Sequence, residues 1–115
     1  MAVAAVAVLA GCGGGGGSAQ PSGSIKVTLT EFKFDPGTIS APSGKVVFFL
    51  VNAGMASHDL IIRDASNNRV AGSELISAGD STVFTVDSIA AGTYTYFCDQ
   101  PGHEQSGMKG TLTIT

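Results

Sequence analysis

Residues 94–108 read YTYFCDQPGHEQSGM, and they contain one of the two cysteines and one of the two histidines of the 115-residue chain. Cys98, His103 and Met108 follow one another at the spacing C-x4-H-x4-M. Tyr94, Tyr96 and Cys98 alternate along the chain, so in a strand they would share one face. If the two tyrosines face the core, the Cys98 sulfur also points inward, at the end of that strand.

The second histidine, His58, lies far upstream of this stretch. Together with Cys98, His103 and Met108 it completes a soft, mixed set of one thiol, two imidazoles and one thioether. Such a set suits a copper ion that cycles between Cu(I) and Cu(II), as in trigonal His2Cys sites with a weak axial Met. Because His58 is distant in sequence, another element must deliver it, and a site built across two elements is rigid.

Each of these residues also has an ordinary structural explanation. Cys98 alone could be a buried thiol, His58 a core histidine and Met108 a core side chain. The metal interpretation is favoured because both histidines of the chain fall into the pattern together. A Cys12–Cys98 disulfide is a further alternative, although it would join a loose arm to the core. Met55 is a conceivable extra ligand, but its neighbours predict a surface loop.

Length and composition restrict the class of protein. A chain of 115 residues predicts one domain, and its formal net charge is -3 with no basic patch. Nucleic acid is therefore not an expected partner. After residue 24, Val, Ile, Thr and Phe alternate with polar residues, and no segment shows a long 3.6-residue period. The chain is therefore predicted to be all-β.

Seven to eight short strands separated by Gly/Pro turns predict a β-sandwich. The first strand is expected from Ile25 and to continue through Glu31–Phe34, and another is expected over His58–Ile62. Val83 is expected to pack inward from a strand at 81–87, with Phe84 as a second candidate. The stretch 63–80 is the least regular, with a helical turn or a short edge strand at 74–77. The remaining strands are expected at 38–41, 45–52, 93–98 and 109–115.

The N-terminal residues resemble targeting and linker sequence. Residues 1–11 form an apolar run that is too short to span a bilayer and resembles the core of a secretory signal. Leu9-Ala10-Gly11-Cys12 looks like a bacterial lipobox, in which Cys12 becomes lipidated. The first basic residue is Lys26, so we expect the true start to lie upstream of Met1. The alternative is that Cys12 is an ordinary, unmodified cysteine in a flexible N-terminus. Residues 12–24 would then be the lipidated Cys plus a Gly/Ser-rich flexible tether with an r.m.s. span of roughly 20 Å.

The motifs of the folded part are similar to those of one family. Asn52-x-Gly54 with His58, and Gly92-x-Tyr94-x-Tyr96-x-Cys98 with His103 and Met108-Lys109-Gly110, resemble a cupredoxin, or type 1 blue copper protein. The Cys-to-Met loop is most similar to the azurin and auracyanin branch. The resemblance covers residues 25–115 and implies a Greek-key β-sandwich with one copper ion. It assigns the metal ligands to His58, Cys98, His103 and Met108.

The resemblance also implies a role. Cupredoxins transfer single electrons, so the expected partners are redox proteins such as a cytochrome, an oxidase or a photosynthetic reaction centre. With the lipidated Cys12, the chain would be a membrane-tethered, monomeric carrier in the bacterial periplasm or on the outer face of the cell membrane. The second ligand histidine, His103, would lie near the surface. Small or apolar residues would surround it as a docking face: Ala53, Gly54, Met55, Ala56, Pro101, Gly102 and Gly107.

Three positions depart from the family pattern. Asp59 stands where many members have Asn, and it is expected to accept backbone N–H bonds or to shift the potential of the site. Asp99 follows Cys98 in place of a small hydroxyl residue. Two ionised carboxylates beside the metal would favour Cu(II). Ser57 replaces the azurin glycine before the first ligand, which favours a four-coordinate site.

An enzyme is not expected. Copper oxidases and nitrite reductases place a His next to the blue-site Cys, whereas Phe97 and Asp99 flank Cys98. The competing class is a periplasmic copper chaperone or storage protein. Such proteins usually expose open Met- or His-rich sites, whereas this loop is predicted to be closed.

Overall fold

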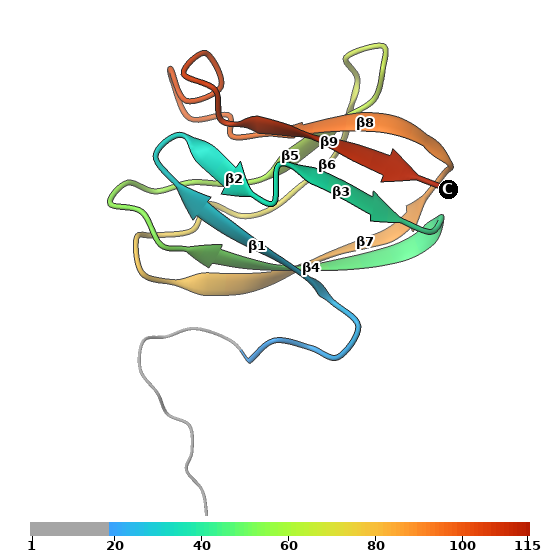
Figure 1. Cartoon of the computed structure of the whole chain (residues 1–115), viewed down its shortest axis with the longest axis horizontal. Coiled ribbons are helices and arrows are strands. Elements are labelled where there is room, and N and C mark those ends of the chain that lie inside the picture. Colours follow the sequence, from blue (N-terminus) through green and yellow to red (C-terminus); the bar gives the residue numbers. More distant parts are fainter. Residues whose placement is uncertain (1–18) are drawn as a thin grey trace, which may run out of the picture.

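The computed structural model describes residues 19–115, and these form two β-sheets (Figure 1). The signal-like segment at 1–11, Cys12 and the tether up to residue 18 lie outside the described residues. Between residues 19 and 115 the structure has no helix that is long and apolar enough to cross a membrane.

The strands divide into a four-stranded and a five-stranded sheet. The first sheet has the order β2-β1-β4-β7, with strands at Lys33–Asp35, Ile25–Thr30, Gly44–Asn52 and Ser81–Ile89. The second has the order β3-β9-β8-β5-β6, with strands at Thr38–Ala41, Lys109–Ile114, Gly92–Phe97, Ile61–Arg63 and Arg69–Gly72. β1 pairs with β4 and β3 pairs with β9 in parallel, and the other pairs are antiparallel. The prediction of an all-β sandwich is confirmed, with nine strands in the described part.

The space between the sheets is filled by the apolar residues that alternate along the strands. Phe48 and Phe84 stack with ring centroids 5.7 Å apart, and Phe34 meets the edge of Tyr96 at 5.1 Å. The Tyr96 hydroxyl donates to the carbonyl of Pro36 at 2.6 Å. Gly110 is required beside it, because a Cβ there would collide with the Tyr96 ring. Residue Val83, predicted to pack inward, is instead 38% exposed, because alternation turns Phe84 to the core.

Two strand predictions were wrong, and both errors lie near the predicted metal site. Glu31–Phe34 does not extend the first strand. The chain turns at Glu31 and Phe32 and returns as β2, antiparallel to β1. The strand predicted from His58 begins only at Ile61. His58 itself forms an isolated bridge with Ile76, through backbone hydrogen bonds of 3.1 and 2.8 Å.

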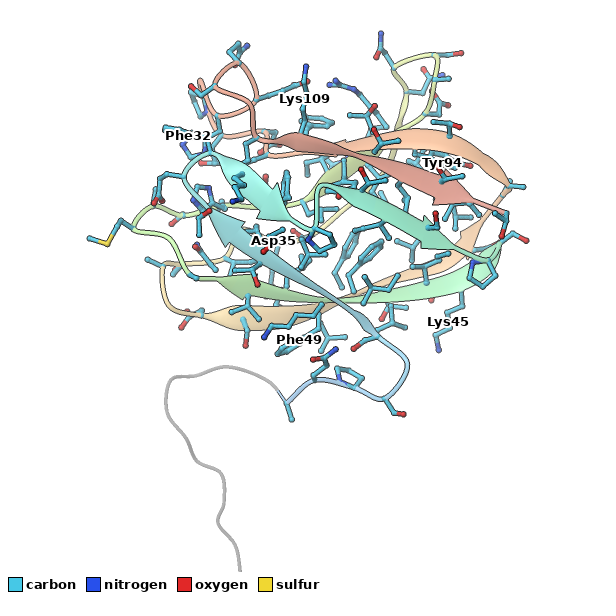
Figure 2. All side chains as sticks on the ribbon, in the orientation of Figure 1. Phe32, Asp35, Lys45, Phe49, Tyr94 and Lys109 are labelled. Atoms are coloured by element: carbon cyan, nitrogen blue, oxygen red, sulfur yellow. The ribbon has the colours of Figure 1, made fainter. Side chains whose placement is uncertain are left out.

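Three connections gather at one end of the sandwich, at the left in Figure 1. They are the β1–β2 turn, the β4–β5 connection at residues 53–60 and the β8–β9 loop at residues 98–108. Figure 2 shows Phe32 at this end, and Lys45 and Tyr94 at the opposite end. The turn that was predicted as strand therefore lies with the two segments that carry the predicted ligands.

Candidate metal centre

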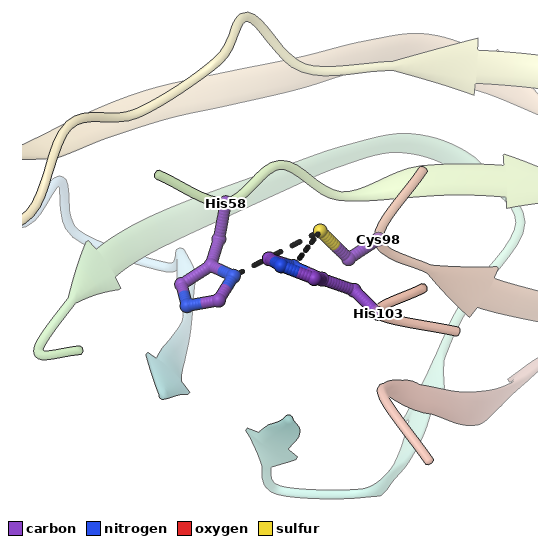
Figure 3. Close-up of side chains that lie close together, drawn as sticks. All are labelled: His58, Cys98 and His103. Carbon is purple, nitrogen blue, oxygen red and sulfur yellow. Dashed lines mark hydrogen bonds between the residues drawn. The ribbon is translucent and has the colours of Figure 1, made fainter. Parts of the chain in front are cut away.

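The structure brings together three of the four predicted ligands. The donor atoms of His58, Cys98 and His103 all lie within 4.8 Å of one another. Cys98 Sγ is 3.4 Å from Nδ1 of His103 and 3.9 Å from Nδ1 of His58. Figure 3 shows the three side chains converging, His58 from the β4–β5 connection and Cys98 and His103 from the β8–β9 loop, with both rings presenting Nδ1 to the sulfur.

Most of the predicted ligands are buried. His58, Cys98 and Met108 are fully buried, whereas His103 is only partly buried. Met108 is fixed at the end of the loop, because its N–H donates to the His103 carbonyl at 3.1 Å and its carbonyl accepts from Cys98 N–H at 3.2 Å. Met108, the fourth predicted ligand, therefore lies in the core. Its backbone is hydrogen-bonded to the backbone of both Cys98 and His103. Of the four predicted ligands, only His103 is therefore partly exposed to solvent.

The loop at 98–108 closes on itself through backbone hydrogen bonds. Besides the two bonds of Met108, His103 N–H donates to the Gln100 carbonyl at 3.0 Å and Gly107 N–H to the Glu104 carbonyl at 2.9 Å. Gly102 and Gly107 have φ angles of 80° and 110°, which favour glycine. A salt bridge of 2.5 Å between Arg63 and Glu104 ties the loop to β5.

Asn52, the last residue of β4, organises the other ligand-bearing connection. Its side-chain amide donates to the carbonyls of Ala56 and Ile76, both at 2.9 Å, and its Oδ1 accepts from Gly54 N–H at 2.9 Å. Asn52 is 1% exposed, so these bonds are made in the interior. Ala56 lies two residues before His58, and Ile76 is the bridge partner of His58. Asn52 therefore holds both the chain that leads to His58 and the segment that pairs with it.

Sequence reasoning missed Glu31 as a residue of the site. Its Oε2 lies 2.9 Å from Nε2 of His58, on the side of the ring away from Cys98. The same carboxylate accepts the N–H groups of Met55 and Ala56. These bonds, with the one to His58, lower the pKa of Glu31 to about 2, so the group is ionised. The signal in the sequence was a change of phase: Glu31 takes a position that the alternation gives to an apolar residue, and Phe32 and Phe34 follow on the other parity.

Phe32, next in the chain, packs against the other histidine. Its ring meets the ring of His103 edge-on, with centroids 5.0 Å apart and planes at 67°. Phe32 is 40% exposed. The β1–β2 turn therefore contacts both predicted histidine ligands, one through Glu31 and the other through Phe32.

Asp59 connects the two ligand-bearing segments, as the sequence suggested it could. Its Oδ1 accepts the N–H of Asp99 at 3.0 Å. Burial raises the pKa of Asp59 to about 6, with a contribution from its hydrogen bond to the Asp99 side chain. That same bond lowers the pKa of Asp99. Below about pH 6 the pair therefore favours a single negative charge, held mainly on Asp99.

The donor set fits a soft metal ion. Burial raises the pKa of the Cys98 thiol, so a thiolate there needs a compensating cation. One thiolate sulfur and two imidazole nitrogens, with a methionine nearby, are the donors typical of blue copper centres. Every buried side-chain nitrogen and oxygen in residues 19–115 has a hydrogen-bond partner. The side chains that carry the three donors are thus already held in place by the groups around them.

Comparisons with known proteins agree with this geometry. Auracyanin-B of Chloroflexus aurantiacus is 48% identical over 48 residues, which span 42% of this chain but only 20% of that protein. A plastocyanin of Scenedesmus fuscus is 30% identical over 86 residues, covering 70% of this chain and 85% of its own. The copper-resistant cuproprotein CopI of Rubrivivax gelatinosus is 24% identical over 84% of this chain and 69% of its own length.

Solved structures share the same architecture. An auracyanin B structure matches 85% of this chain and 92% of its own, with a TM-score of 0.73 and 26% identity. The model of the copper-binding proteins of the plastocyanin/azurin family matches residues 21–115, which include both sheets and all three converging donors. Copper is the metal that this family holds, and this chain belongs to the plastocyanin/azurin family of copper-binding proteins.

Proposed function

We propose that the chain is a single-electron carrier whose one copper ion is held by His58, Cys98, His103 and Met108. The observation that carries the proposal is the convergence of one thiol and two Nδ1 atoms within 4.8 Å, in a member of this family. When bound, copper supplies a one-electron couple between Cu(I) and Cu(II). The chain contributes donors that the fold already holds in place, which limits movement between the two oxidation states.

The test is a titration of the metal-free protein with Cu(II). We expect one ion per chain and an intense thiolate charge-transfer band in the visible. Cys98→Ser should abolish that band. The assignment is wrong if the Cys98→Ser protein keeps the band of the wild type.

Met108 would be the fourth residue to hold the copper ion. A thioether sulfur favours Cu(I) more than an oxygen donor does. Met108→Gln should therefore lower the reduction potential while copper stays bound, as measured by redox titration of the visible band. An unchanged potential would exclude this role for Met108.

We propose that electrons enter through His103, with a redox protein such as a cytochrome, an oxidase or a reaction centre as partner. His103 is the partly exposed member of the donor set, and Met55, on the β4–β5 connection at the same end of the sandwich, is 90% exposed. A small apolar contact suits a transient redox encounter. Met55→Glu should leave the visible spectrum unchanged and slow the bimolecular electron-transfer rate. The matched control is Val83→Glu, which adds the same charge on β7. Equal rates in the two variants would place the port elsewhere.

Copper storage or resistance is the second candidate, and the similarity to the copper-resistant cuproprotein of R. gelatinosus favours it. A store needs no reversible couple, so the two functions differ in colour and in redox behaviour. A blue or green protein that is reduced and reoxidised reversibly supports electron transfer. A colourless protein that holds only Cu(I) supports storage or transport.

We propose further that Cys12 is acylated and that the chain is an extracytoplasmic, membrane-tethered protein. The support is the Leu9-Ala10-Gly11-Cys12 sequence and the Gly-rich stretch after it. Given an intact signal in a bacterial host, the wild type should fractionate with membranes, and Cys12→Ser should block maturation. Identical acyl-free N-termini in both proteins, by mass spectrometry, would contradict the anchor.

A further inference from the structure

The β1–β2 turn supplies a carboxylate that the ligand pattern does not include. Glu31 Oε2 accepts three donors at once, from Met55 N–H at 2.8 Å, Ala56 N–H at 2.8 Å and His58 Nε2 at 2.9 Å. All three donors belong to the connection that delivers His58. The side chain of Glu31 is 32% exposed, whereas that of His58 is 0% exposed.

The contact with Nε2 decides which nitrogen of His58 carries the proton. Glu31 Oε2 already accepts two backbone N–H groups, so it acts as an acceptor here and the proton of the neutral ring lies on Nε2. Nδ1 is then left with its lone pair, and Nδ1 is the atom that faces Cys98 Sγ. Carboxylate partners of metal-ligating histidines act in this way in many metal sites, fixing the tautomer and ring orientation and raising ligand basicity.

The backbone around the carboxylate is shaped to receive it. A Cβ on Gly54 would lie 2.6 Å from Glu31 Oε2, so only a residue without a side chain lets the carboxylate approach. The Gly54 N–H is held by Oδ1 of Asn52 at 2.9 Å, which presents the following two N–H groups to Glu31. Glycine at this position therefore has a steric reason that is independent of the hydrogen bonds.

We propose that Glu31 is a positioning residue of the metal centre, which holds the connection at 53–57 and fixes the His58 ring with Nδ1 directed at the metal. This inference rests on the proposed role of His58 as a copper ligand. Losing such a partner typically costs 10–100-fold in metal affinity. The negative charge beside a ligand also favours Cu(II), so its removal should raise the reduction potential.

Two variants test the proposal, with a matched control. Glu31→Ala should weaken Cu(II) binding by about 10–100-fold in a competition titration. Glu31→Gln keeps the shape and one acceptor oxygen without the charge, so it should bind Cu(II) with an affinity between those of Glu31→Ala and the wild type, and should have a raised potential. Glu74→Gln removes a carboxylate that likewise accepts a side-chain hydrogen bond, from Thr82 in β7, and that belongs to neither ligand-bearing segment. It should leave the affinity and the His58 ring unchanged.

Two readouts on the metal-free protein separate this inference from the proposed function. Ring ¹⁵N shifts should show the Nε2–H tautomer of His58 in the wild type and a mixture in Glu31→Ala. Amide hydrogen exchange of Met55 and Ala56 should accelerate in the same variant. If the wild type binds no copper, but Glu31→Ala still changes the His58 tautomer and the exchange rates, the proposed function fails and the positioning role stands. If copper binds while Glu31→Ala keeps the tautomer, the exchange rates and the affinity, the positioning role is overturned.

Gly54→Ala is a further variant that disturbs the Glu31–His58 contact and keeps the carboxylate charge. The added methyl must displace Oε2, so this variant should shift the His58 tautomer and accelerate exchange at Met55 and Ala56, as Glu31→Ala does. It also covers the case in which Glu31→Ala does not fold. A Gly54→Ala protein that retains all wild-type values would count against the proposal.

Discussion

The two segments that deliver the predicted ligands are held in different ways. The connection at 53–60 places His58 through side chains from other parts of the chain, namely Asn52 at the end of β4 and Glu31 in the β1–β2 turn. The loop at 98–108 places Cys98, His103 and Met108 mainly through hydrogen bonds within its own backbone. One segment is therefore positioned by its surroundings, and the other largely by itself.

This difference shows where the information for each ligand lies in the sequence. A self-closed loop keeps its ligands, glycines and turn residues inside one short window, so its motif can be recognised directly. A connection that is held from outside depends on residues that meet it only after the sheets have formed. Substitutions should therefore have wide effects around His58 and local effects around His103.

The largest effect is expected for Asn52→Ala. Truncation removes three hydrogen bonds, to the carbonyls of Ala56 and Ile76 and from Gly54 N–H, and each is worth about 0.5–1.5 kcal/mol. The free energy of unfolding of the metal-free protein should fall by about 3 kcal/mol in urea titrations. Gln100→Ala, which removes only an exposed bond to Asp99, serves as control. A loss no larger than that of the control would show that the connection does not depend on Asn52.

A smaller and local effect is expected for Gly107→Ala. The φ angle of 110° is unfavourable for a residue with a Cβ, at a cost of about 1–2 kcal/mol. Amide exchange should accelerate at Met108 but stay unchanged at Met55 and Ala56. Gly37→Ala is the control, because a Cβ there meets its nearest atom at an ordinary 3.8 Å. Faster exchange at Met55 would mean that the two segments are coupled more tightly than their hydrogen bonds indicate.

The smallest effect is expected for Asp64→Asn, in a turn that carries no predicted ligand. Asp64 Oδ1 accepts the N–H groups of Ser66 and Asn68, both at 2.9 Å, and the bond from Asn68 is the main cause of its lowered pKa. A lowered pKa gives stability that is present above the ordinary value and lost as the pH falls through the folded value. The wild type should therefore melt slightly higher than the variant at neutral pH, and this difference should vanish in acid. A difference that grows in acid would contradict the assignment.

The sandwich and the Cys98–Met108 loop could be predicted because both depend on patterns among residues that are close in sequence. Alternating Val, Ile and Thr indicate strands, and the inward face of Tyr96 places Cys98 in the core. Val83 and Phe84 are both apolar neighbours, so the pattern alone did not decide which one faces inward. The packing of Phe84 against Phe48 settles it.

The β1–β2 turn could not be predicted for a different reason. The apolar residues change from odd to even positions at Glu31 and Phe32, but no Gly or Pro marks a reversal, and a change of phase also fits a β-bulge within one strand. Their conformation is favoured by contacts with His58 and His103, which lie far along the chain. Local propensity therefore predicts a longer strand, and tertiary contacts override it.

The parallel pairing of β3 with β9 has a consequence for the order of folding events. Thr38 pairs with Thr111 and Ala41 with Ile114, so this contact closes nearly the whole described chain. Topologies dominated by such non-local contacts fold slowly, because the entropy of loop closure is lost before the contacts form. His58 and Cys98 both lie within the segment that this contact closes, and Glu31 of the β1–β2 turn, in the other sheet, meets His58 only once the two sheets have packed. Metal capture is therefore expected as a late kinetic step, on a chain that has already folded.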